Sequence, residues 1–147
     1  MRDQGIEILL VEDNPDDLEM TLRALRRAKL ANHIQVAHDG VEALDYIFGR
    51  SAHPGQPVDK GPRFILLDLK LPKLDGLEVL RRVKADPRTS LIPVVVLTSS
   101  KEQPDVRECY RLGVNSYIVK PVNFENFVNC VVEMGMYWLL LNHPPHE

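Results

Sequence analysis

The chain has 147 residues, of which 44% are hydrophobic and 27% charged, and 18 basic against 21 acidic residues give a net charge of -3. We expect one globular domain, residues 1–147, with a single core and no output domain. The small negative charge gives no general electrostatic reason to bind nucleic acid or an anionic membrane. No apolar segment has the length of a signal peptide or a membrane span, so we expect a cytoplasmic protein.

Short apolar runs alternate with helical patterns along the whole chain. The runs predict five strands, at 6–11, 33–37, 64–68, 92–98 and 116–120. The patterns between them predict five helices, at 15–28, 40–48, 77–85, 104–112 and 124–141. In the fourth helix we expect Val106, Cys109 and Tyr110 to face the core. Both cysteines, Cys109 and Cys130, lie in apolar helical patterns, which favours buried free thiols over a disulfide or a zinc site.

Five strand and helix repeats predict an α/β fold: a doubly wound, five-stranded parallel sheet with helices on both faces. The flavodoxin-like strand order for such three-layer sandwiches is 2-1-3-4-5. Residues 64–67 are apolar throughout, as in a strand buried on both faces, whereas 33–37 alternates and belongs nearer an edge. The connection 49–62 is longer than is usual between such elements, and we interpret it as a tolerated surface insertion.

Four of the predicted strands end in chemically distinctive side chains. Glu12 and Asp13 follow the first strand, Asp68 ends the third, and Thr98 and Lys120 end the last two. Because parallel strands place their carboxyl ends at one edge of the sheet, we expect these residues to converge there.

The three acids, roughly 5 Å apart if the first and third strands are neighbours, would repel one another. A raised carboxyl pKa or a bound hard divalent cation would relieve the repulsion, and magnesium fits such a shallow site better than calcium. With magnesium and Lys120 neutralising a phosphoryl group and Thr98 donating a hydrogen bond, Asp68 could act as an in-line nucleophile.

Four blocks of sequence resemble, in order and spacing, the motifs of bacterial response-regulator receiver domains. The blocks are Leu10–Asn14, Leu66–Gly76, Val96–Ser99 and Tyr117–Pro121. The resemblance covers the whole chain and implies a CheY-like fold. It further implies that Asp68 accepts phosphate from the phosphohistidine of a sensor histidine kinase, and that Glu12, Asp13, Asp68 and the backbone carbonyl of Lys70 hold magnesium.

The same resemblance assigns roles to the residues across the site. It implies that Thr98 and Lys120 contact the phosphate, and that Thr98 and Tyr117 form a switch. It implies a signalling protein whose only chemistry is its own phosphorylation and dephosphorylation, rather than an enzyme with a separate substrate. The 49–62 loop, the run 92–100 and the segment 137–139 are similar to small regulators paired with bacterial phytochromes, so a bacteriophytochrome becomes a candidate kinase.

Three alternatives stay open on the residues alone. A magnesium-dependent phosphohydrolase of the haloacid-dehalogenase type also uses an aspartate at a strand end, but it needs a second acid where this chain has Lys70. A flavodoxin-like flavin carrier would bind a phosphate at its first loop, which the acids of 12–17 would repel. A receiver that never turns over could serve purely as an interaction module.

The last predicted helix carries more apolar surface than one face of the sheet can cover. One stripe at helical spacing suits the core: Phe124, Phe127, Val128, Val131, Gly135 and Trp138. A second stripe lies beside it: Val132, Met136, Leu139 and Leu140. Apolar patches of this size usually mark an interface, so we expect a homodimer in which two such helices pack about a two-fold axis. The alternative is a helix that folds back over its own neighbour.

Overall fold

The computed structural model describes residues 7–29, 33–49, 62–120 and 123–136. The strands are β1 (Glu7–Val11), β2 (His33–Ala37), β3 (Phe64–Leu67), β4 (Val94–Thr98) and β5 (Ser116–Val119). The helices are α1 (Pro15–Arg27), α2 (Gly40–Phe48), α3 (Gly76–Ala85), α4 (Gln103–Arg111) and α5 (Phe124–Met136). Most of the 49–62 connection, and the predicted continuation of the last helix past Met136, lie outside the described residues.

All five strands are parallel and follow the order β2-β1-β3-β4-β5, which confirms the predicted fold. β2 is an edge strand, as its alternating pattern indicates, and β3 is buried on both faces. Val11 pairs with Leu67, and Thr98 pairs with Val119. These two pairings put the residues that follow β1 and β3, and those that follow β4 and β5, at one edge of the sheet.

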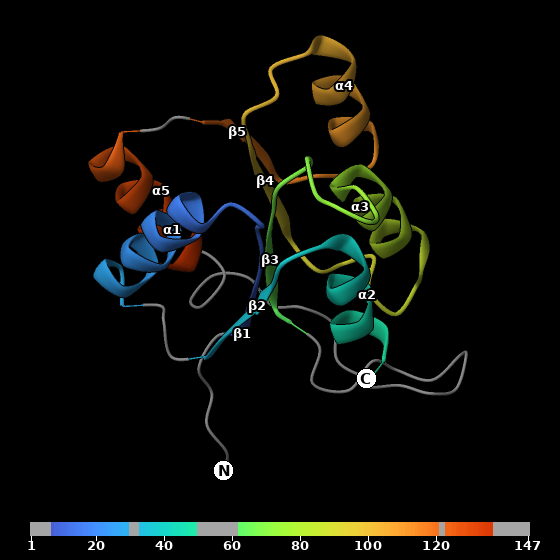
Figure 1. Cartoon of the computed structure of the whole chain (residues 1–147), viewed down its shortest axis with the longest axis horizontal. Helices are drawn as coiled ribbons and strands as arrows, with labels where there is room; N and C mark the ends of the chain where they lie inside the picture. The colour runs from blue at the N-terminus through green and yellow to red at the C-terminus, as the bar shows by residue number, and fades with distance from the viewer. Residues whose placement is uncertain (1–6, 30–32, 50–61, 121–122, 137–147) are drawn as a thin grey trace.

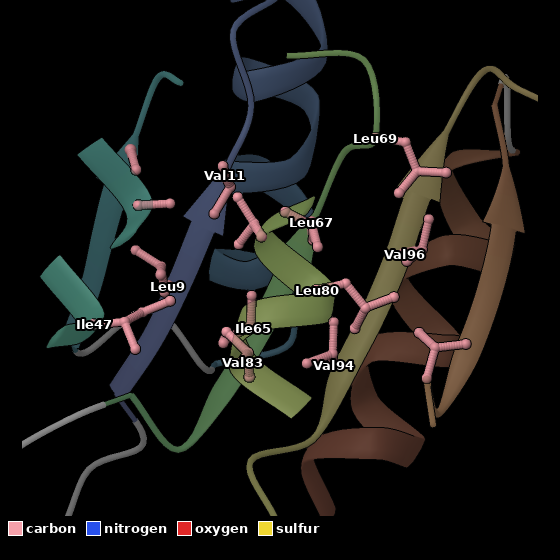
Figure 2. Packing of buried hydrophobic residues seen from close by; sticks show 14 of the residues in the cluster. Leu9, Val11, Ile47, Ile65, Leu67, Leu69, Leu80, Val83, Val94 and Val96 are labelled. Carbon is pink, nitrogen blue, oxygen red and sulfur yellow. The ribbon is translucent and has the colours of Figure 1, made fainter. Parts of the chain in front are cut away.

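The helices cover both faces of the sheet, with α1 and α5 on one side and α2, α3 and α4 on the other (Figure 1). Successive strand residues point to opposite faces, so each face has its own apolar cluster. Leu9, Ile65 and Val94 pack with the α2 and α3 side chains Ile47 and Leu80 (Figure 2). No helix among the described residues is long and apolar enough to cross a membrane.

The starts of α1, α2 and α3 are each fixed by a capping side chain. Asn14, Asp39 and Asp75 each accept a hydrogen bond from the backbone N–H three residues later, at 2.9, 2.8 and 3.1 Å. Such caps satisfy amide groups that have no partner inside the helix. Gly113, just past the end of α4, has a φ of 100°, the left-handed conformation that glycine adopts at little cost. The Asn14 cap fixes where α1 begins, directly after Glu12 and Asp13, the two acids that follow β1.

Three sequence expectations are corrected by the structure. β4 begins at Val94 and not at 92, because the Ile92 amide bonds the Thr89 carbonyl in the preceding turn and Pro93 has no N–H. Tyr110 is 52% exposed, since α4 buries only Cys109 fully. Cys109 is a buried free thiol as expected, whereas Cys130 is free but only partly buried.

Candidate functional site

The carboxylates that follow β1 and β3 meet at the edge of the sheet. The Asp68 amide donates to the Val11 carbonyl at 3.1 Å, which continues the β1–β3 pairing by one residue. This bond sets Asp68 beside Glu12 and Asp13, and one carboxylate oxygen from each of the three lies within 4.8 Å of the others. The clustering expected from strand order is therefore present in the structure.

Burial differs sharply among the three acids. Glu12 is 2% exposed and Asp68 7%, while Asp13 is exposed to solvent. Burial raises the pKa of Glu12 to about 7, and the nearby charge of Asp68 adds to the rise, while the hydrogen bond from Lys120 opposes it. A raised carboxyl pKa was expected from mutual repulsion alone. Burial is in fact the larger cause, because the end of β1 is covered from both sides.

Lys120 reaches from the end of β5 across the site to the acids. Its Nζ donates to Asp17 Oδ2 at 2.7 Å, to Glu12 Oε1 at 2.9 Å and to Asp68 Oδ2 at 3.2 Å. The lysine side chain is only 9% exposed. Burial lowers the pKa of Lys120, but hydrogen bonds with Asp17 and Glu12 and the charge of Asp68 outweigh it and raise that pKa above its ordinary value. Lys120 is therefore held as a cation among three carboxylates.

The loop between β3 and α3 wraps closely around Asp68. The Lys70 amide donates to Asp68 Oδ1 at 3.2 Å, and the Gly76 amide donates to the Leu69 carbonyl at 2.8 Å. A Cβ on Gly76 would collide with the Asp68 carbonyl oxygen, so only glycine lets α3 begin this close to the acid. The Lys70 side chain is exposed, and its carbonyl oxygen, expected as a metal ligand, stays a prediction.

Thr98 ends β4 next to the site and is fully buried. Its Oγ1 accepts a hydrogen bond from the Ser100 amide at 3.3 Å, and the Ser100 carbonyl accepts one from the Tyr117 hydroxyl at 2.9 Å. The Ser100 hydroxyl donates to Asp105 Oδ2, in the first turn of α4, at 2.6 Å. Thr98 thus lies at the edge of the sheet, as its position at a strand end indicates, and there it belongs to a buried hydrogen-bond network.

Two residues of the site were missed by the sequence analysis. Asp17 contacts Lys120 although it lies on α1 and not at a strand end. Its signal was available, because Asn14 caps α1 and so directs the first turn, with Asp17 in it, toward the same edge. Ser100 is one of the hydroxyl residues at the carboxyl end of β4, but its contacts were not predictable, since they depend on the path of the loop between β4 and α4.

The donor set suits a hard divalent cation. Three carboxylates with oxygens within 4.8 Å of one another are ligands that Mg²⁺ and Mn²⁺ prefer, whereas zinc favours nitrogen and sulfur. The single positive charge of Lys120 does not balance Glu12, Asp13, Asp17 and Asp68 together. A divalent cation would supply the missing charge, so the residues present fit a metal.

Comparisons with known proteins agree with this geometry. The family model described as "Response regulator receiver domain" matches residues 8–132. The probable methanogenesis regulatory protein FilR2 of Methanothrix harundinacea is 44% identical over 138 residues, covering 94% of this chain and 86% of that protein. The response regulator Rcp1 of Synechocystis is 36% identical over 132 residues, covering 90% and 88%.

Solved structures give the same result. The phosphorylated cyanobacterial phytochrome response regulator RcpA is 35% identical with a TM-score of 0.79, covering 97% of this chain and all of that one. The Mn²⁺-bound form of Rcp1 is 34% identical with a TM-score of 0.78 and the same coverage. The bacteriophytochrome response regulator AtBRR is 50% identical with a TM-score of 0.71, covering 96% of this chain and all of that one.

The chain belongs to the response-regulator receiver domain family. It is a receiver of two-component signalling, and the general function of this family is to be phosphorylated by a sensor histidine kinase. Receivers also bind a divalent metal, in keeping with the carboxylate cluster found here.

Proposed function

We propose that Asp68 is the phosphoacceptor of this receiver and that phosphorylation requires magnesium. The observation that carries the proposal is the position of Asp68. Its carboxylate is nearly buried at the centre of the sheet edge, with Lys120 Nζ at 3.2 Å and two further acids within 4.8 Å. A buried carboxylate whose neighbours supply both a cation and metal ligands is equipped for phosphoryl transfer, which depends on positioning and charge neutralisation.

In the proposed transfer, a carboxylate oxygen of Asp68 attacks the phosphorus of a phosphohistidine. The phosphorus–oxygen bond forms as the phosphorus–nitrogen bond breaks, and the electron pair of the broken bond stays on the imidazole nitrogen. The Lys120 ammonium is already within hydrogen-bond distance of Asp68 and would neutralise an oxygen of the incoming group. Thr98 would contact a second oxygen after its hydroxyl turns from the Ser100 amide.

Glu12, Asp13, Asp68 and the backbone carbonyl of Lys70 would hold the magnesium ion. Bound there, the ion would neutralise charge on the phosphoryl oxygens. Without the ion, these carboxylates would make the site strongly negative, and they would repel an incoming phosphoryl group. The manganese found with Rcp1 supports a divalent cation at this type of site.

The likeness to RcpA, Rcp1 and AtBRR supports a phytochrome-type sensor kinase as the phosphodonor. We propose that residues 1–147 act as a single receiver domain with no separate substrate, and that its only chemistry is its own phosphorylation and dephosphorylation. Signal output would then pass through a protein contact formed after the Thr98 and Tyr117 side chains rearrange.

We also propose the homodimer expected from the second apolar stripe of the last helix. Val132 is 38% exposed on α5, which supports an uncovered face. Met136 ends that helix, and Leu139 and Leu140 lie outside the described residues. Sedimentation of the wild type beside a Met136→Glu, Leu140→Glu double variant tests this. A wild type that stays monomeric at high micromolar concentration, both phosphorylated and unphosphorylated, would show the proposal to be wrong.

Labelling with a small phosphodonor such as acetyl phosphate tests the central proposal. The wild type should gain one acid-stable, base-labile phosphate in magnesium and none in excess chelator. Asp68→Asn, which is nearly the same size but lacks the nucleophilic carboxylate, should gain none. Undiminished labelling in chelator, or of the Asp68→Asn variant, would overturn the assignment.

A further inference from the structure

The Lys120 ammonium has no spare donor in this structure. An ammonium carries three N–H groups, and here three carboxylates accept from it: Asp17, Glu12 and Asp68. A phosphoryl group on Asp68 brings new oxygens to the same place. For Lys120 to donate to one of them, it has to release a carboxylate that it now holds.

The three carboxylates differ in what release would cost. Glu12 is 2% exposed, so a charge left on it would be nearly without water. Asp68, whose side chain is 8% exposed, loses its own carboxylate charge when it is phosphorylated and stays next to the ammonium because the phosphoryl group is bonded to it. The Asp17 side chain is 36% exposed. A carboxylate that regains water on release loses much less free energy than one that stays buried and unpaired.

The position of Asp17 on α1 lowers that cost further. Asp17 lies in the first turn of the helix, and its own amide bonds the Asn14 cap at 2.9 Å. A negative side chain in the first turn is stabilised by the partial positive charge of the helix N-terminus, whether or not Lys120 is near. The hydrogen bond from Lys120 Nζ to Asp17 Oδ2, at 2.7 Å, is nonetheless the shortest of the three. Asp17 therefore keeps one N–H of the ammonium engaged until a stronger acceptor arrives.

We propose that Asp17 is a positioning residue that holds Lys120 while Asp68 is unmodified and gives up that contact when a phosphoryl group occupies Asp68. This inference rests on the proposed phosphorylation of Asp68. The phosphoryl group adds negative charge beside Lys120, while Asp17 moves into solvent at the start of α1. Asp17 thus competes with the phosphoryl group for one cation and sets how tightly the site binds it.

A neighbouring acid provides a matched control. Asp16 lies in the same turn and is exposed, and its side chain makes no hydrogen bond or ion pair with another described residue. Asp16→Asn removes the same long-range charge as Asp17→Asn but leaves the contact with Lys120 in place. A difference between the two variants therefore measures the contact itself.

The experiment is a calorimetric titration with beryllofluoride, a phosphoryl mimic, at magnesium concentrations that saturate each variant. Asp17→Asn and Asp17→Ser should bind beryllofluoride about three- to tenfold more tightly than Asp16→Asn, the size expected for one partly exposed ion pair. Asp17→Glu keeps a carboxylate within reach of Lys120 and should bind within about twofold of the wild type, since the same type of pair is retained.

The outcomes separate this inference from the proposed function. If the wild type binds no beryllofluoride, or binds it equally after Asp68→Asn, the proposed phosphorylation of Asp68 is wrong and the role of Asp17 is wrong with it. If binding depends on Asp68 but Asp17→Asn and Asp17→Ser bind beryllofluoride no more tightly than Asp16→Asn does, only the competition is wrong. Equal tightening by Asp17→Glu and Asp17→Asn would also overturn it, because the effect would then not depend on the charge.

Discussion

The Tyr117 hydroxyl donates a hydrogen bond of 2.9 Å to the backbone carbonyl of Ser100. The amide of the same residue donates to Thr98 Oγ1 at 3.3 Å, and its hydroxyl donates to Asp105 Oδ2 at 2.6 Å. Ser100 thus joins Thr98, beside the proposed phosphorylation site, to the Tyr117 ring on β5 and to the first turn of α4. If Thr98 turned to a phosphoryl group, the Ser100 amide would lose its acceptor, and both other contacts would be affected.

Thr98→Ala should therefore still accept phosphate at Asp68 but transmit little change to α4 and β5. The alanine keeps the strand and lacks the hydroxyl that exchanges the Ser100 amide for a phosphoryl oxygen. Backbone chemical shifts of α4 and β5, recorded with and without beryllofluoride, measure the transmission. Shift changes as large in Thr98→Ala as in the wild type would refute the coupling.

Tyr117→Phe should lower the free energy of unfolding by about 1 kcal/mol, because the Ser100 carbonyl loses its partner in a partly buried place. Tyr110→Phe is the control, since Tyr110 is 52% exposed on α4 and its hydroxyl makes no hydrogen bond with another described residue. Urea unfolding of both variants gives the two values. Equal losses, or no loss in Tyr117→Phe, would mean that the Ser100 contact contributes nothing to the fold.

The places of β3 and β2 in the sheet were predictable because the apolar pattern of each strand reports its burial, whereas the full strand order came from the arrangement typical of such folds. The unbroken apolar run of β3 places it centrally, and the alternation of β2 places it at an edge. Boundaries were less accurate where a local contact ended a strand, as at Ile92, whose amide bonds Thr89. Tyr110 was expected to face the core but is exposed, because helical spacing does not show how closely α4 packs against the sheet.

The acids of the site were predictable from their positions at strand ends, whereas the partners of Lys120 were not. Strand order alone brings Glu12 and Asp68 together. Asp17 reaches the site because of the direction in which α1 runs, and Ser100 because of the path of the loop between β4 and α4. Side chains that reach a site from neighbouring elements depend on packing between those elements, which spacing along the chain does not record.

Gly76→Ala should destabilise the protein strongly, by about 2 kcal/mol or more, and slow the labelling of Asp68. The added methyl would collide with the Asp68 carbonyl oxygen, so the start of α3 would have to move away from the acid. Gly113→Ala is a useful comparison, because there the cost comes from a φ of 100° and not from a collision. Urea unfolding and acetyl phosphate labelling of both variants are the measurements. Normal labelling in Gly76→Ala would show that α3 does not constrain Asp68.

Without metal, the protein should become less stable as pH rises from about 4.5 to about 7. Burial raises the pKa of Glu12 from 4.5 to about 7 in the folded state, so the folded protein holds this proton more tightly than the unfolded chain does. The resulting stabilisation is complete below 4.5 and is lost as pH rises through 7, by up to about 3 kcal/mol. Chelated protein unfolded in urea at several pH values gives this slope.

Glu12→Gln is the control for this pH dependence, because it keeps a polar side chain of similar size without a titrating group. Its stability should change little between pH 5 and pH 7. The carboxyls with lowered pKa, Asp39, Glu78, Asp86 and Glu108, contribute stability above their unfolded values and lose it only as pH falls, so they act below this window. A slope that persists in Glu12→Gln would assign the effect to another group.

Magnesium should oppose this loss of stability. The ion binds a site that exists only when β1 and β3 are paired, so at 100 times its dissociation constant it should stabilise the fold by about 2.7 kcal/mol. Because the proton on Glu12 competes with the cation, the gain should be larger at pH 8 than at pH 6. Asp13→Asn, which removes one acid of the cluster, should reduce the gain, whereas Asp16→Asn should change it little. Melting temperatures of the three proteins at both pH values, with chelator or millimolar magnesium, test this. A wild-type melting temperature that ignores magnesium at pH 8 would mean that these carboxylates do not form a metal site.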